Sequence, residues 1–142
     1  MSMLKDKPEG WVKPAVSKMY LLIKDSITFP DKAGFQVIDV GHAVNGAAHA
    51  GAMIASRWPR QRIESKAAGW MTDEVMVDWY DQSFRKVCCK VNEQQFEKAK
   101  TYFPPEEWFA VTESHFEGAE IILVFKPRTE WPEFFKSLKL YR

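Results

Sequence analysis

The chain is organised around residues 34–58, GFQVIDVGHAVNGAAHAGAMIASRW. This stretch contains no proline, and its small and apolar residues recur at helical spacing, so we predict that it forms the longest helix. One predicted side carries Val37, Val40, Val44, Ala47, Ala48, Gly51 and Ala55, and the opposite side carries Ile38, His42, Asn45, His49 and Met53. Alanine and glycine stand where a surface helix would carry lysine and glutamate. We therefore expect neighbours to cover this helix on more than one face, and any functional site to lie at its entrance.

A short apolar run precedes this predicted helix. Residues 18–24, KMYLLIK, are rich in strand-forming residues, and the length of the run predicts a buried central strand. Residues 25–33 then form a loop in which Pro30 disfavours helix. A strand, a loop and a long helix in this order open an α/β unit, where ligands gather at the carboxyl ends of strands and the amino ends of helices.

The remaining sequence alternates between helical and strand patterns. We predict further strands at residues 85–91, 108–112 and 119–126, the last two forming a hairpin around residues 113–118. The predicted helices are residues 72–81 with Thr72 as N-cap and Trp79 in the core, residues 92–102 with Asn92 as N-cap, and a last helix with Thr129 as N-cap and Pro132 in its first turn.

This order of elements predicts an α/β fold, with a four-stranded mixed sheet and helices on both faces. With 142 residues, of which 46% are apolar, the chain is long enough for one domain with a substantial core. We place that domain at residues 18–142, after an extended lead-in at residues 1–17.

Composition and the cysteine positions indicate the compartment in which we expect the protein. The sequence has no apolar run of about 18 residues, and its beginning, MSMLKDKPEGW, lacks the hydrophobic segment of a signal peptide. We therefore expect a soluble cytoplasmic protein with no membrane partner. Cys88 and Cys89 are adjacent on a predicted strand and point to opposite faces, which argues against a disulfide between them and favours a reducing compartment. The net charge of +1 neither demands nor excludes a nucleic-acid partner.

Candidate chemistry lies at two places in the pattern. Asp39 comes early in the predicted long helix and His42 follows three residues later, so the carboxylate can orient the imidazole to activate water. The alternatives are a carboxylate that serves only the helix dipole and a histidine that only packs. Glu113, Ser114 and His115 follow the third predicted strand, where α/β proteins often carry function; the alternative is a polar turn.

Cofactor and metal motifs are missing from the sequence. Asp39, His42 and His49 do not match the spacing of a dedicated metal site, so we predict no metal, and we assign His49 a structural role. No glycine-rich phosphate loop or nucleophile elbow occurs, and we expect no cofactor.

Basic residues follow the predicted long helix. Arg57, Arg60, Arg62 and Lys66 are interleaved with Trp58, a composition that can hold a phosphate backbone and stack on a base. The same composition describes an ordinary solvated connection.

These residues resemble a known family. KMYLLIK, a loop and then G-x-x-x-x-x-x-G-H-A-V resemble the opening of the type 2 peptidyl-tRNA hydrolases. Trp79 with the following RKVCCKVNEQQFEKAK resembles a later segment of that family, and FFKSLKLYR is similar to its ending. The resemblance spans about residues 18–142.

The resemblance implies hydrolysis of the ester in peptidyl-tRNA, or in a related aminoacyl-tRNA, with release of free tRNA. At the family's lysine this chain has Phe35, and the nearest lysine is Lys32. The family's next glutamine corresponds to Asp39, its histidine to His42, and its aspartate after the third strand to Glu113.

From these positions we expect Asp39 or Glu113 as general base, His42 as orienting or proton-transferring partner, and Lys32 as electrostatic stabiliser. The expected substrate contacts are Asn45, Ser114, His115, Arg57, Arg60 and Arg62. The alternative is a non-catalytic RNA- or protein-binding module on the same fold. The oligomeric state is open, with a homodimer as one candidate.

Overall fold

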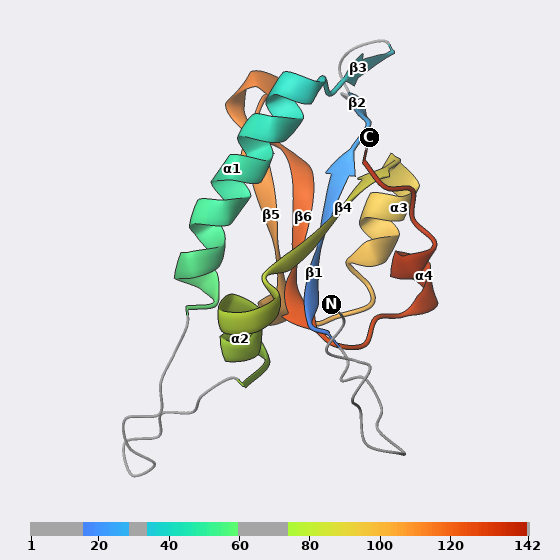
Figure 1. Ribbon diagram of the computed structural model, residues 1–142. Coiled ribbons are helices and arrows are strands. Elements are labelled where there is room, and N and C mark those ends of the chain that lie inside the picture. Colours follow the sequence, from blue (N-terminus) through green and yellow to red (C-terminus); the bar gives the residue numbers. More distant parts are fainter. Residues whose placement is uncertain (1–15, 29–33, 60–73, 142) are drawn as a thin grey trace, which may run out of the picture.

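A four-stranded mixed sheet is the centre of this small α/β domain (Figure 1). The computed structural model describes residues 16–28, 34–59 and 74–141. The sheet has the order β4-β1-β6-β5, with β1 parallel to β4 and antiparallel to β6, and with β5 and β6 forming an antiparallel hairpin. The strands are β1 (Lys18–Lys24), β4 (Arg85–Val91), β5 (Trp108–Glu113) and β6 (Ala119–Arg128). The α/β class and the interior position of the first strand are confirmed.

Helices cover both faces of this sheet, as predicted. They are α1 (Val40–Arg57), α2 (Glu74–Asp78) with the π-helical turn η2 (Trp79–Ser83), α3 (Glu93–Ala99) and α4 (Glu133–Lys136), with short 3-10 turns η3 (Pro105–Glu107) and η4 (Ser114–Phe116). None of the helices in the described ranges could cross a bilayer.

Strand β1 has a core on each side. Met19, Leu21 and Ile23 pack in the cluster that includes residues of α1, α2 and η2, whereas Tyr20 and Leu22 pack with residues of α3 and α4. Full burial of one such side chain stabilises the fold by about 1.5–3 kcal/mol. Burial on both faces explains why the strand is apolar throughout instead of alternating.

The long helix begins later than predicted. Residues 34–39 are not helical: β3 (Phe35–Val37) pairs with β2 (Ser26–Thr28) in a separate two-stranded sheet, which also corrects the loop predicted for residues 25–33. Gly34 has a φ of 81°, a left-handed conformation that glycine adopts without strain. Asp39 is the N-cap, with φ −74° and ψ 167°, and so lies just before the first turn.

Only one face of α1 is covered, so the prediction of several covered faces is wrong. The buried residues are Ala43, Gly46, Ala50 and Ile54. Val40 and Val44, which were expected in an apolar stripe against the protein, are 64% and 62% exposed. At Gly46 the helix lies close to the sheet, because a Cβ on this residue would be only 2.8 Å from Cδ1 of Ile122 in β6.

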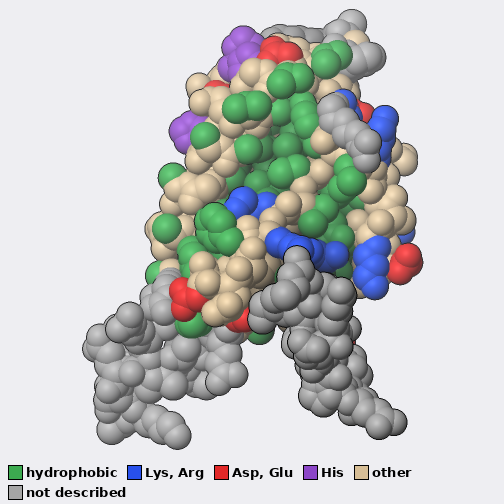
Figure 2. All heavy atoms as spheres, viewed as in Figure 1, with side chains coloured by type: hydrophobic (Ala, Val, Ile, Leu, Met, Phe, Trp, Pro, Cys, Tyr) green, Lys and Arg blue, Asp and Glu red, His purple; other side chains and the backbone are tan. Residues whose placement is uncertain are grey.

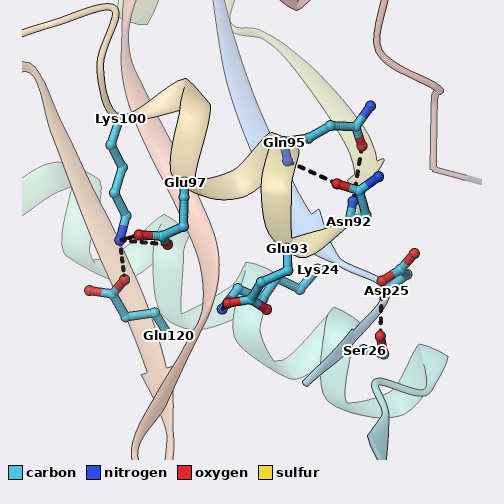
Figure 3. Close-up of polar contacts among 9 residues, drawn as sticks. All are labelled: Lys24, Asp25, Ser26, Asn92, Glu93, Gln95, Glu97, Lys100 and Glu120. Carbon is cyan, nitrogen blue, oxygen red and sulfur yellow. Dashed lines mark hydrogen bonds and ion pairs between the residues drawn. The ribbon is translucent and has the colours of Figure 1, made fainter. Parts of the chain in front are cut away.

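Helix α3 begins with a reciprocal cap (Figure 3). The Asn92 side chain accepts a hydrogen bond from the Gln95 backbone N–H at 2.8 Å, and the Gln95 side chain accepts one from the Asn92 backbone N–H at 2.9 Å. Next to it, the buried Lys24 ammonium lies 3.1 Å from a Glu93 oxygen and 4.3 Å from the centroid of the Phe96 ring. The predicted N-cap is confirmed, although the α-helix ends at Ala99 instead of reaching residue 102.

The other predicted helix caps have different outcomes. Thr129 is not a cap, because β6 continues to Arg128 and Pro132 occupies the N-cap position of α4. Thr72 lies outside the described residues, as do residues 1–15 of the predicted lead-in. Trp79 is buried as expected, and its indole N–H donates to the Arg85 carbonyl at 2.8 Å.

The outer side of β4 pairs with the segment that follows α4. The Lys90 backbone N–H donates to the Lys139 carbonyl at 2.9 Å, and the Tyr141 N–H donates to the Cys88 carbonyl at 2.8 Å. Between these two bonds, Cys89 and Leu140 form an antiparallel bridge. Both cysteines are free and lie in different core clusters, and burial raises the pKa of the Cys89 thiol to about 11.

Candidate functional site

Polar side chains from two separate parts of the chain meet where α1 begins. One group belongs to the start of α1, and the other to the end of β5 and the turn η4. Figure 2 shows histidine and acidic side chains side by side at the upper end of the molecule, where Figure 1 places the start of α1. We call the following residues the entrance cluster: Asp39, His42, Asn45, Glu113 and His115.

The Asp39 carboxylate has two roles within the entrance cluster. One of its oxygens accepts a hydrogen bond from the His42 backbone N–H at 2.9 Å, which caps α1, and both oxygens lie 3.0 Å from Nδ1 of the His42 ring. The backbone hydrogen bond from His42, followed by the side-chain hydrogen bond, lowers the pKa of Asp39 below its ordinary value of 3.8. Near neutral pH the carboxylate is therefore ionised.

This contact determines which nitrogen of His42 carries a proton. An ionised carboxylate only accepts hydrogen bonds, so Nδ1 must be the donor. In the neutral ring, Nε2 is then the acceptor nitrogen. The His42 side chain is 28% exposed, so the imidazole is partly accessible to water. Asp39 thus orients a ring that can accept a proton.

A second imidazole packs on His42. The rings of His42 and His115 are stacked, with centroids 4.1 Å apart and an interplanar angle of 25°. The buried Phe116 ring meets both imidazoles edge to face, at 5.1 Å from His42 and 5.0 Å from His115. Phe116 therefore supports the stack from beneath and limits how far either ring can turn.

Asn45 joins the helix to the end of β5. Its Nδ2 donates to a Glu113 oxygen at 3.3 Å, one turn beyond His42 along α1. The Asn45 amide has two N–H donors, and this bond uses one of them. Ser114, which was predicted as a substrate contact, is exposed in η4 between Glu113 and His115.

Sequence reasoning missed two residues of this region, Gln36 and Phe116. Nε2 of Gln36 lies 3.5 Å from Nε2 of His115. Gln36 reaches this position because it is in β3, whereas the sequence pattern had placed it inside the long helix. Phe116 could have been found from its place as the apolar residue in an otherwise polar predicted turn.

The predicted basic contacts do not join the entrance cluster as far as the structure describes them. Arg57 is exposed in the last turn of α1, 15 residues beyond His42 and so about 22 Å along the helix axis. Lys32, Arg60, Arg62 and Lys66 lie outside the described residues. Within the described ranges, no lysine or arginine forms an ion pair with Asp39 or Glu113.

The chemistry of the cluster is that of proton transfer more than of metal binding. In the described part of the chain, no three His, Cys, Asp or Glu side chains are grouped so that they could hold a metal ion. Two carboxylates, two imidazoles and one amide can instead activate a water molecule and donate a hydrogen bond to a nearby oxygen. In comparisons with known proteins, no family model matches this chain, and no curated protein matches it significantly.

Proposed function

We propose that this protein hydrolyses the ester that joins a peptidyl or aminoacyl group to the 3′ ribose of tRNA. The observation that carries the proposal is the Asp39–His42 pair, stacked against His115 and lying beside the Asn45–Glu113 contact. His42 belongs to a segment that resembles the type 2 peptidyl-tRNA hydrolases, and Glu113 stands where that family has an aspartate. Their meeting at the amino end of a helix supports a common role.

The hydrogen bonds favour His42 as the base in this reaction. With Nδ1 held by Asp39, Nε2 takes a proton from water while the water oxygen attacks the ester carbonyl carbon. Asp39 stabilises the imidazolium that forms, as a carboxylate does in triads of this type. The ring of His115, stacked at 4.1 Å, offers a π face against that cation.

The tetrahedral intermediate then needs a donor for its oxyanion and a proton for its leaving group. The second N–H of Asn45 is suited to the first task, with Lys32 as the further stabiliser expected from the sequence. The imidazolium returns its proton to the ribose oxygen as the carbon–oxygen bond of the ester breaks. The products are free tRNA and a peptide carboxylate.

Phosphate contacts must come from elsewhere, because two carboxylates repel the RNA backbone. Arg57 at the far end of α1, together with Arg60 and Arg62, is proposed to hold the RNA away from the ester. A separation of about 22 Å between Arg57 and His42 suits contacts along an RNA stem.

The direct test is to incubate the purified protein with a peptidyl-tRNA and to measure release of free tRNA. We expect release well above the spontaneous rate, and a loss of about 10² to 10⁴ in rate for His42→Ala. His49→Ala, on the same helix but outside the entrance cluster, is the matched control and should retain the activity of the parent. No release by the parent at high protein concentration would overturn the hydrolase proposal.

One observation favours the second candidate, a non-catalytic module that binds RNA or protein. Phe35 stands at the family's lysine position, and its backbone belongs to β3, not to the first turn of α1. A protein that lacks this lysine at the start of α1 can retain the fold without the hydrolase activity. Binding of tRNA without hydrolysis of its ester would support this candidate over the first.

A further inference from the structure

A cavity of about 560 Å³ lies at the edge of the sheet opposite the entrance cluster. Among the described residues, its lining includes Lys18, Arg85, Thr129, Glu130, Trp131 and Lys136. These residues come from the first positions of β1 and β4, from the segment after β6, and from α4. Figure 2 shows Lys and Arg side chains gathered in the lower half of the view, near the start of β1. Since β1 spans about 20 Å, the cavity is separate from His42.

The charge of this lining is unbalanced. Lys18, Arg85 and Lys136 supply three positive charges, against one carboxylate from Glu130. None of these three cations forms an ion pair with another described residue, whereas Lys24, Lys100 and Arg128 all do. By count, the described lining therefore carries a net charge of about +2.

Two of these charged residues are neighbours on paired strands. Lys18 and Arg85 are register partners on the parallel strands β1 and β4, so their side chains leave the same face of the sheet. Like charges on directly paired residues destabilise a sheet. An anion bound between them would remove this repulsion, which gives the arrangement a physical reason to exist.

The donors suit an oxyanion of a particular kind. The Arg85 guanidinium can donate two parallel hydrogen bonds to a phosphate, the lysines add point charges, and the Thr129 hydroxyl adds a donor. A phosphate monoester carries nearly two negative charges at neutral pH, which matches the lining better than the single charge of a backbone phosphodiester. A concave site of this volume is also within the range of small-ligand pockets.

We propose that this cavity binds the phosphate monoester group of a ligand, with Lys18, Arg85 and Lys136 as its recognition residues. Such a group can belong to a small phosphorylated molecule, such as a nucleoside monophosphate, or to the phosphorylated end of an RNA. The site goes beyond the proposed hydrolase function and does not depend on it, because it shares no residue with the entrance cluster.

The test is calorimetric titration of the whole protein with inorganic phosphate, and then with a nucleoside monophosphate. Loss of one charged hydrogen bond of this kind corresponds to about tenfold weaker binding, so we expect at least that loss for Arg85→Gln and for Lys136→Gln. Glu130→Gln should tighten binding, because it removes the opposing charge. Lys139→Gln, which removes a cation beside the far end of β4, and His42→Ala should leave the affinity unchanged.

Two short RNAs that differ only in a terminal phosphate identify the source of the group. Tighter binding of the phosphorylated RNA than of the nucleoside monophosphate assigns the site to RNA ends, and equal binding assigns it to small ligands; both results support a monoester site. Absence of saturable phosphate binding, or an equal loss of affinity in Lys139→Gln, would overturn the proposal.

Discussion

Helices α1 and α3 begin in the same way and lead to different results. Each has a side-chain N-cap, Asp39 in α1 and Asn92 in α3, and in each the third helical residue contacts that cap. In α3 this residue is Gln95, whose side chain turns back to the Asn92 backbone, so that the cap is closed on itself (Figure 3). In α1 it is His42, whose ring turns to the Asp39 carboxylate instead.

Under the proposed function, the same local device serves stability in α3 and chemistry in α1. A closed cap pairs two backbone N–H groups with two amide oxygens, and its amide side chains do not take up or release a proton near neutral pH. The Asp39 cap satisfies one backbone N–H and also holds the Nδ1 side of an imidazole, whose Nε2 takes the proton in the proposed reaction. The change from glutamine to histidine at this helical position separates the two outcomes.

Replacing the N-cap residue should change the hydrolysis rate when it is done in α1 but not when it is done in α3. Asp39→Asn keeps an N-cap through its amide oxygen, but it loses the charge and replaces the second oxygen with an N–H donor, which no longer fixes the tautomer of His42. We therefore expect hydrolysis of peptidyl-tRNA to fall by about 10² or more, with only a small loss of thermal stability. Asn92→Asp, the matched exchange in α3, should leave the rate unchanged. Equal activity of Asp39→Asn and the parent, measured as tRNA release, would show that the carboxylate only caps the helix.

Removing the closed cap should cost stability without affecting function. Asn92→Ala leaves the Gln95 backbone N–H without its partner, and we expect the free energy of unfolding to fall by about 1 kcal/mol in urea titrations. Gln94→Ala is the control, since Gln94 is exposed on the same turn, and it should unfold like the parent. A loss of tRNA release in Asn92→Ala at a temperature where the protein stays folded would contradict the assignment of this cap to stability alone.

The two caps should also differ in how stability depends on pH, which is the smallest of the three effects. The pKa of Asp39 is lowered in the folded protein, so its contribution is complete above the ordinary value of 3.8 and is lost as the pH falls through the lowered folded value. Asn92 does not titrate. Thermal unfolding of the parent and of Asp39→Asn should therefore converge below pH 3.8, whereas the stability difference between the parent and Asn92→Ala should stay constant. A parent-to-Asp39→Asn difference that does not change with pH would contradict this account.

The sequence was most informative for short runs of strand-forming residues. Residues 18–24 and 85–91 were predicted as strands with the bounds that the structure shows, because a short run of strand-forming residues between polar flanks leaves few alternatives. The N-cap Asn92 was also predicted, since its contact partner lies only three residues away. Interactions between neighbours in sequence can be read from one sequence without homologues.

The errors arose where distant contacts decide the structure. β2 and β3 have three residues each and are stabilised by pairing with one another, so no periodicity could indicate them. In α1, Gly46 contacts the sheet while Val44 faces solvent, because close packing against Ile122 selects a face that apolar periodicity did not identify. Asp39 and His42 were predicted as a pair from their spacing. Stacking of His115 on His42 depends on the end of β5 and could not be predicted from spacing.

The pairing of residues 139–141 with β4 has a consequence for the behaviour of the protein at high concentration. β4 is an edge strand of the four-stranded sheet, and exposed edges are where chains add to one another and aggregate. Here the backbone groups of Lys139 and Tyr141 form hydrogen bonds with those of Lys90 and Cys88 on that edge. Any second molecule that adds a strand to β4 along this stretch must first displace this segment, so this part of the edge is protected against edge-to-edge association.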